Sequence, residues 1–267
     1  MTSGGGEETT NVLDRFRLDG KVAVVTGASS GLGVLFSTAL ADAGADLVLG
    51  ARRAELLEET RRAVEARGRR CICVRTDVVS PDDCEALVAA ATEQLGGPHI
   101  LVNNAGVGSV VPAHKEDPAE FLRVLHVHLL GAYQMAQSFA RACIAAGHPG
   151  AIVNVSSVLG LVSADVPQAA YVSAKAGLLG LTRELAMQWT ARRGIRVNAL
   201  VPGLMDAGIT GRLTSNEEHY AAALTSIPMG RLGDPSELAG ALLLLVSDAG
   251  SYITGSSLVV DGGWTIH

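Results

Sequence analysis

The chain alternates short, almost wholly apolar runs with longer stretches in which apolar residues recur at helical spacing. The apolar runs cover residues 21–26, 47–49, 71–75, 99–103, 151–155, 195–200 and 257–260. The helical patterns cover residues 31–43, 54–67, 81–95, 118–146, 169–192 and 235–247. Apolar strands separated by helices are typical of a parallel sheet that is buried on both faces. The pattern contains no repeat or linker, and it predicts one doubly wound α/β domain.

Composition supports one large core and argues against several classes of function. Apolar residues make up 48% of the 267 residues, and the formal net charge is −6. An acidic balance disfavours a nucleic-acid or anionic-membrane surface as the main role. The longest uninterrupted apolar run covers only residues 239–246, whereas a membrane span needs about 20 residues. We therefore expect a soluble, cytoplasmic protein.

The N-terminus and the cysteines carry no sign of secretion or of a metal site. Residues 1–11 are small, polar and acidic, without a signal or transit pattern, and we expect a disordered leader. The four cysteines are Cys71, Cys73, Cys84 and Cys143. Cys71 and Cys73 alternate along a strand and should face the same side. Because no further pair stands at ligand spacing, we expect free, buried thiols and no metal.

A glycine-rich loop, Thr26-Gly-Ala-Ser-Ser-Gly-Leu-Gly33, follows the first predicted strand. Glycines at a strand–helix junction let the backbone approach a pyrophosphate, and the next helix offers free N–H donors there. A tight turn without a ligand is the alternative interpretation. The loop predicts a dinucleotide site.

The end of the second strand indicates which dinucleotide is bound. NAD sites place an acid about 20 residues past the glycines, but this strand ends in Arg52 and Arg53. An arginine can form a charge-assisted pair with a 2′-phosphate. We predict NADP(H) over NAD(H). The alternative is that both arginines only solvate the start of a helix.

Candidate acid–base chemistry follows the fifth strand. Ser157 ends that strand, and Tyr171 and Lys175 follow on a helix at positions i and i+4, which share a face. A phenol that works at neutral pH needs its pKa lowered by roughly three units. One positive charge about 4 Å away supplies about that effect, so we expect Lys175, helped by the positive nicotinamide ring of the oxidised cofactor, to lower the pKa of Tyr171. A serine hydroxyl beside the phenol would polarise a substrate carbonyl.

Taken together, these features resemble the short-chain dehydrogenase/reductase family in its compact, single-domain form. The resemblance covers about residues 17–264 and rests on the glycine loop, Asp77-Val78, Asn103-Asn-Ala-Gly106, Ser157, Tyr171-Val-Ser-Ala-Lys175, Pro202-Gly203 and Asp261-Gly-Gly263. It implies a Rossmann-like, seven-stranded parallel sheet flanked by helices. It also implies hydride transfer between a nicotinamide cofactor and a carbonyl or alcohol. On this basis we divide the chain into a leader, 1–16, and one NAD(P)-binding domain, 17–267.

The resemblance also implies residue roles. Tyr171 would be the proton donor in reduction, Ser157 the carbonyl-binding hydroxyl, and Lys175 the ligand of the nicotinamide ribose. Only one of Ser156 and Ser157 can face the cleft, and the family pattern selects Ser157. The predicted cofactor contacts are Gly27, Ser29, Ser30, Gly31, Leu32, Gly33, Arg52, Arg53, Asp77, Val78, Asn104, Ala105, Gly106, Tyr171, Lys175, Pro202, Gly203 and Leu204.

Three positions depart from the family pattern. His128 stands where members usually carry an Asn that anchors a water in a proton relay. We predict that His128 takes this catalytic role and that its titration near neutrality tunes the relay, the alternative being a packing role. Ala207 replaces a Thr that touches the carboxamide, with Thr210 as a candidate substitute. The interval between Ser157 and Tyr171 is one residue longer than usual.

The substrate and the assembly are the least determined features. The expected substrate lid, residues 204–223, mixes small and polar residues with Arg212, His219 and Tyr220. This favours a polar or mid-sized small molecule, a 3-oxo compound or a sugar-acid-like alcohol. The resemblance implies a homotetramer, or a homodimer, paired through the helices at 118–146 and 169–192. The rival function is a non-catalytic dinucleotide-binding sensor or scaffold.

Overall fold

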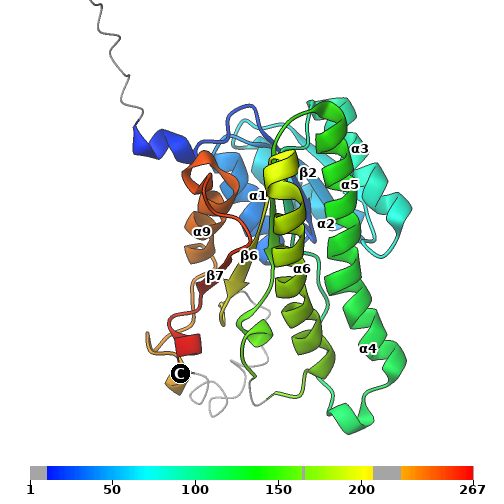
Figure 1. Ribbon diagram of the computed structural model, residues 1–267, viewed down its shortest axis with the longest axis vertical. Coiled ribbons are helices and arrows are strands. Elements are labelled where there is room, and N and C mark those ends of the chain that lie inside the picture. The colour runs from blue at the N-terminus through cyan, green and yellow to red at the C-terminus, as the bar shows by residue number, and fades with distance from the viewer. Residues whose placement is uncertain (1–10, 164–165, 207–223, 267) are drawn as a thin grey trace, which may run out of the picture.

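The computed structural model describes residues 11–163, 166–206 and 224–266 (Figure 1). Its centre is a seven-stranded sheet in the order β3-β2-β1-β4-β5-β6-β7, with every neighbouring pair parallel. The strands are β1 Val22–Thr26, β2 Asp46–Ala51, β3 Cys71–Arg75, β4 Ile100–Asn103, β5 Gly150–Val155, β6 Ile195–Pro202 and β7 Ser257–Val260. The predicted parallel sheet is confirmed, and the strand boundaries lie within a few residues of those expected.

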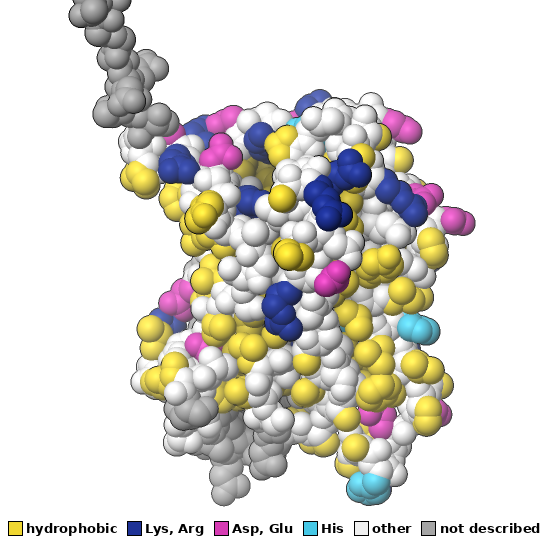
Figure 2. All heavy atoms as spheres, in the orientation of Figure 1, with side chains coloured by type: hydrophobic (Ala, Val, Ile, Leu, Met, Phe, Trp, Pro, Cys, Tyr) yellow, Lys and Arg dark blue, Asp and Glu magenta, His cyan; other side chains and the backbone are white. Residues whose placement is uncertain are grey.

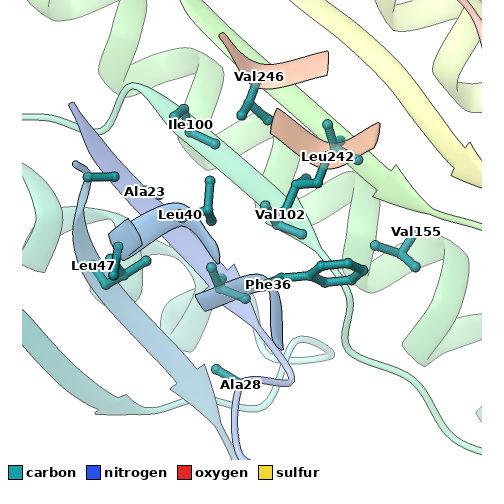
Figure 3. Close-up of a cluster of buried hydrophobic side chains, with 14 of the residues drawn as sticks. Ala23, Ala28, Phe36, Leu40, Leu47, Ile100, Val102, Val155, Leu242 and Val246 are labelled. Carbon is teal, nitrogen blue, oxygen red and sulfur yellow. The ribbon is translucent and has the colours of Figure 1, made fainter. Parts of the chain in front are cut away.

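Helices cover both faces of the sheet, because side chains of each strand alternate between two cores. The helices are α1 Leu32–Asp42, α2 Ala54–Glu65, α3 Pro81–Leu95, α4 Pro118–Leu125, α5 Gly131–Ala146, α6 Ala169–Arg193 and α9 Glu237–Val246. In one core, Phe36 and Leu40 of α1 and Leu242 and Val246 of α9 pack on the sheet (Figure 3). The other core joins α3, α5 and α6, where Phe139 is fully buried. The doubly wound architecture is therefore confirmed.

The predicted helix over residues 118–146 is interrupted. A π-helical turn, His126–Leu130, separates α4 from α5, although the backbone angles stay in the helical region on both sides. A π turn widens the helix by one residue and often marks a functional site. Here it carries His128, so the distortion lies where the sequence departs from the family pattern.

The prediction of a disordered leader over residues 1–16 is wrong for its last five residues. Val12–Phe16 form a short 3-10 helix, which begins with the Asn11 side chain accepting a hydrogen bond from Leu13 N at 3.1 Å. Arg15 Nη2 donates to Asp248 O at 2.8 Å and thereby ties this helix to the C-terminal part of the domain. The composition of the segment did not reveal these contacts, because they join residues far apart in the sequence.

The cysteines and the helices bear on two further expectations from the sequence. Cys84 and Cys143 are buried, whereas Cys71 and Cys73 are only partly buried, and all four are free. No helix within the described ranges combines the length and apolar character of a membrane span.

Candidate active site

The glycine loop follows β1, whose neighbours in the sheet are β2 and β4. The strand order reverses at this point. In such folds ligands bind in the crevice at the carboxyl ends of the strands. A Cβ on Gly33 would lie 2.1 Å from Gly27 O, and one on Gly27 would lie 2.8 Å from Ala105 Cα. Gly27 also has φ +66°, which favours glycine. The loop therefore forms a tight glycine cradle with no room for a side chain at Gly27 or Gly33, and the backbone N–H groups at the start of α1 suit a pyrophosphate.

The residues after β4 are fixed against this loop. Asn104 Nδ2 donates to Thr26 O at 3.1 Å and to Gly27 O at 3.2 Å. Thr26 Oγ1 accepts hydrogen bonds from the backbone N–H groups of Asn104 and Ala105 at 3.0 and 3.1 Å. The structure thus brings the predicted contacts Asn104 and Ala105 to the glycine loop.

The predicted adenine-end residues lie at the same edge of the sheet. Asp77 and Val78 follow β3, and the Asp77 N–H donates to Asp83 Oδ2 at 2.8 Å. Val78 is buried, and its carbonyl accepts a hydrogen bond from Gln134 Nε2 at 2.8 Å. Arg52, at the tip of β2, is exposed.

Arg53 connects the tip of β2 to the glycine loop. Its Nη2 atom donates to Ser30 Oγ at 3.3 Å. The only acid of β2, Asp46, lies at the other end of the strand and is paired with Arg70 at 2.7 Å. No β2 carboxylate is therefore placed to accept the ribose hydroxyls.

At the end of β6, Gly203 is packed on the segment after β7. A Cβ at Gly203 would lie 2.7 Å from Asp261 Cα, and Gly203 N donates to Val260 O at 2.9 Å. Pro202 is buried as the last residue of β6, and Leu204 O accepts from Gly233 N at 3.0 Å. Ala207, Thr210 and the rest of the expected lid from residue 207 onward lie outside the described residues.

Ser157 and Tyr171 face each other across the end of β5. Ser157 is the second residue beyond the strand, and its Oγ accepts a hydrogen bond from Leu159 N at 3.2 Å. A hydrogen bond with Ser157 acts to lower the pKa of Tyr171, against the larger effect of burial. Ser156 points away, because its buried Oγ donates to Lys175 O at 3.0 Å. The geometry thus matches the choice of Ser157 over Ser156.

Lys175 lies next to Tyr171, but burial has the largest effect on the pKa of the phenol in the protein without its cofactor. Its Nζ atom is 5.5 Å from the centroid of the Tyr171 ring and donates to Val155 O at 2.6 Å. Burial raises the pKa of Tyr171 and lowers that of Lys175 to about 7. The expectation considered only the attraction between charges. In the folded protein the ammonium itself is desolvated, so its charge is only partly present at neutral pH.

His128 reaches the same site from the π turn. Its ring lies edge-on to Tyr171, with centroids 5.2 Å apart. His128 Nε2 is 2.7 Å from Val107 O, and the ring is only 4% exposed. Burial, assisted by the charge of Lys175, lowers the pKa of His128 to about 3. The prediction that His128 titrates near neutrality is therefore wrong.

We expect His128 to stay neutral from pH 5 to pH 8, because its pKa is about 3. Long-range ¹H–¹⁵N NMR spectra of the imidazoles across this range measure it directly. A midpoint near 6.5 for His128 would contradict the burial argument.

Two unpartnered polar atoms accompany these groups. His128 Nδ1 and Asn103 Oδ1 are buried and have no hydrogen-bond partner among the residues that the structure describes. Both residues, with Lys175, line a cavity of about 10 Å³. The Asn103 amide is oriented by donating to Asn154 Oδ1 at 2.9 Å and to Ala132 O at 3.1 Å. Sequence reasoning missed Asn103 as a site residue, although it is the first residue of the Asn-Asn-Ala-Gly motif.

The described residues contain no group of three or more His, Cys, Asp and Glu side chains that could hold a metal ion. The chemistry that these residues can support is instead proton transfer at a phenol, beside a hydroxyl donor and a lysine. Together with the glycine cradle, this arrangement suits a nicotinamide-dependent oxidoreductase.

Comparison with known proteins places this site in a family. A family model described as enoyl-(acyl carrier protein) reductase matches residues 27–265. Galactitol 2-dehydrogenase (L-tagatose-forming) of Cereibacter sphaeroides is 42% identical over 255 residues, 94% of this chain and 97% of that protein. A short-chain type dehydrogenase/reductase from Mycobacterium marinum superposes with a TM-score of 0.92 at 35% identity, covering 96% of this chain and all of that one.

A further solved structure is a gluconate 5-dehydrogenase from Burkholderia cenocepacia J2315 in complex with NADP and tartrate. It has a TM-score of 0.91 and 33% identity, and the match covers 96% of this chain and 100% of that chain. The chain therefore belongs to the short-chain dehydrogenase/reductase family, oxidoreductases that act on CH–OH groups.

Proposed function

We propose that this protein is an NADP(H)-dependent oxidoreductase that interconverts a hydroxyl and a carbonyl group on a polar, sugar-alcohol or sugar-acid-like substrate. The observation that carries this proposal is the meeting of Ser157, Tyr171 and Lys175 beside the glycine cradle. Each group alone has structural explanations, but their convergence at the carboxyl edge of the sheet provides acid–base chemistry next to a dinucleotide site.

Residue roles follow from the geometry. The bound cofactor supplies or accepts the hydride. Tyr171 gives its phenolic proton to the substrate oxygen in reduction and takes it back in oxidation. Ser157 donates a hydrogen bond to the same oxygen and holds it against the phenol. Lys175 would hold the ribose next to Tyr171, and its charged form would favour the phenolate.

The glycine cradle and the arginines would bind the rest of the cofactor. Backbone N–H groups at the start of α1 suit the pyrophosphate, and Arg52 and Arg53 suit the 2′-phosphate. The relative from B. cenocepacia is a complex with NADP, which supports this preference. NAD(H) remains the alternative cofactor.

We expect Arg52→Asp to raise the KM for NADPH at least tenfold and to leave or lower the KM for NADH, because the substitution replaces attraction to the 2′-phosphate by repulsion. Steady-state kinetics with both cofactors measure this change. Arg62→Asp, on the exposed side of α2, is the control for overall charge. Equal effects of Arg52→Asp on both cofactors would contradict the NADP assignment.

His128 supports the acid–base group in this proposal. One water in the cavity can donate to His128 Nδ1 and Asn103 Oδ1 and accept from Lys175, which satisfies both unpartnered atoms. Such a water would replenish the proton of Tyr171 through Lys175. His128 acts here as a neutral acceptor, in agreement with its lowered pKa.

The substrate class rests on the relatives and on the character of the lid. Two of the similar proteins are named as a galactitol 2-dehydrogenase and a gluconate 5-dehydrogenase, and the segment after Leu204 is rich in polar and small residues. A 3-oxo compound is the second candidate, and the 36% identity to the 3-oxoacyl-[acyl-carrier-protein] reductase of Vibrio cholerae supports it.

The proposed assembly is a cytoplasmic homotetramer, or a homodimer. Large apolar side chains on the outer side of α4 and α5 are exposed, among them Leu122, Tyr133 and Ile144. Figure 2 shows hydrophobic side chains gathered on the face formed by α4, α5 and α6. Sedimentation of the purified protein tests the oligomeric state.

The direct test of function is an NADPH-oxidation and NADP⁺-reduction assay over a panel of polyols, sugar acids and 3-oxo thioesters. We expect turnover with at least one polyol or sugar acid. Tight cofactor binding with no turnover on the whole panel would favour the rival function, a dinucleotide-binding sensor.

A further inference from the structure

We propose that Cys71 and Cys73 form a two-sulfur site for a soft, thiophilic metal or metalloid centre, of which trivalent arsenic is the simplest probe. The two residues occupy alternate positions of β3, the edge strand of the sheet, so their side chains lie on one face. Both thiols are free and partly exposed. This pair lies outside the dinucleotide and acid–base site, and the proposal does not depend on the enzymatic function.

The two thiols influence each other's pKa. The largest influence on the pKa of each thiol is a hydrogen bond to the other, which raises the pKa of Cys71 and lowers that of Cys73. Cys73 Sγ also lies 3.6 Å from Leu57 O of α2. The nearby guanidinium of Arg61 acts to lower the pKa of both thiols, against the carboxylate of Glu65. The pair is thus prepared for a ligand that binds two sulfurs at once.

The number of donors decides the type of ligand. No third His, Cys, Asp or Glu joins the pair in a possible metal-binding group within the described part of the chain, so four-coordinate zinc is disfavoured. Thiolate donors select soft centres. A direct disulfide is also disfavoured, because same-face neighbours on a strand lie about 6.6 Å apart. Bonded cysteines need their Cβ atoms within about 4.5 Å, whereas an inserted atom spans a longer gap.

The remaining cysteines provide an internal contrast. Cys84 on α3 and Cys143 on α5 are fully buried, and burial raises the pKa of each to about 12. They lie on different helices and face apolar surroundings. A reagent that needs two accessible sulfurs should therefore select Cys71 and Cys73.

The test is the binding of phenylarsine oxide to the full-length protein. Two As–S bonds replace the arsenic–oxygen bond, and the two thiol protons leave with that oxygen as water, so no electrons are transferred. Trypsin cleaves after Arg70 and Arg75 and releases residues 71–75, which carry both thiols and no other cysteine. We expect one arsenical per chain, located on this peptide. It should persist in excess glutathione and be released by a dithiol.

Cys71→Ser and Cys73→Ser should each reduce retention of the arsenical at least tenfold, and Cys84→Ala, the matched control, should not. Circular dichroism checks that the variants fold. If a variant does not fold, the peptide map of the wild-type chain still shows whether the arsenical is bound to residues 71–75. Undiminished retention in Cys73→Ser, an adduct at Cys84 or Cys143, or no adduct on residues 71–75 of the wild type would overturn the proposal.

Discussion

Replacing Tyr171 by Phe is expected to lower kcat about a thousandfold while leaving the Kd for NADPH within about twofold of the wild-type value. The substitution removes the phenolic proton beside Ser157 and keeps the ring that packs edge-on against His128. General acid–base groups contribute typically 10²–10⁴-fold to rate, which sets the expected size of the loss. Steady-state kinetics and fluorescence titration with NADPH measure the two quantities separately.

The matched control for this variant is Tyr133→Phe. Tyr133 lies on the surface of α5, and its hydroxyl accepts only from Gln137 Nε2 at 3.2 Å. We expect no change in kcat for this control. If Tyr171→Phe kept most of the activity, another group would have to be the proton donor, and the proposed chemistry would be wrong.

Replacing Lys175 by Met is expected to reduce kcat at least a hundredfold and to remove a pH dependence of stability. The pKa of Lys175 falls from 10.5 to about 7 in the folded protein, because burial disfavours the charged form. Between these values the unfolded chain binds more protons than the folded one. The free energy of unfolding of the wild type therefore rises with pH from about 7 upward, by at most about 5 kcal/mol over the full window.

The corresponding measurement compares urea unfolding of wild type and Lys175→Met at pH 7.0 and 9.5. The wild type should gain several kcal/mol relative to the variant over this interval, since the variant lacks the buried amine. The loss of the hydrogen bond to Val155 O affects the variant equally at both pH values, and so it cancels in the comparison. Parallel pH profiles would mean that Lys175 is not desolvated in the folded protein.

The sequence predicted the architecture well because its signals are local. Apolar runs such as residues 22–26 and 150–155 need burial on both sides, and the helical periodicity between them leaves few alternatives to a parallel sheet. The site residues could also be predicted from the sequence, because the carboxyl ends of parallel strands share one edge of the sheet. Ser157 and the glycine loop meet there for that reason.

The features that the sequence did not predict all depend on tertiary surroundings. The pKa directions of Tyr171 and His128 are set by burial, which the i and i+4 spacing of Tyr171 and Lys175 does not report. The π turn at His126–Leu130 lies within an otherwise regular helical pattern. Asn103 became a candidate site residue only when its unpartnered Oδ1 atom was found at the same cavity as His128.

The most direct measurement is a crystal structure of the protein with NADPH bound. The account predicts the pyrophosphate on the glycine loop and the nicotinamide C4 atom facing the Tyr171 hydroxyl and the Ser157 Oγ. It also predicts Lys175 in contact with the nicotinamide ribose. A nicotinamide ring bound away from Tyr171, or a cofactor that does not occupy the loop at Gly27–Gly33, would contradict the central claim.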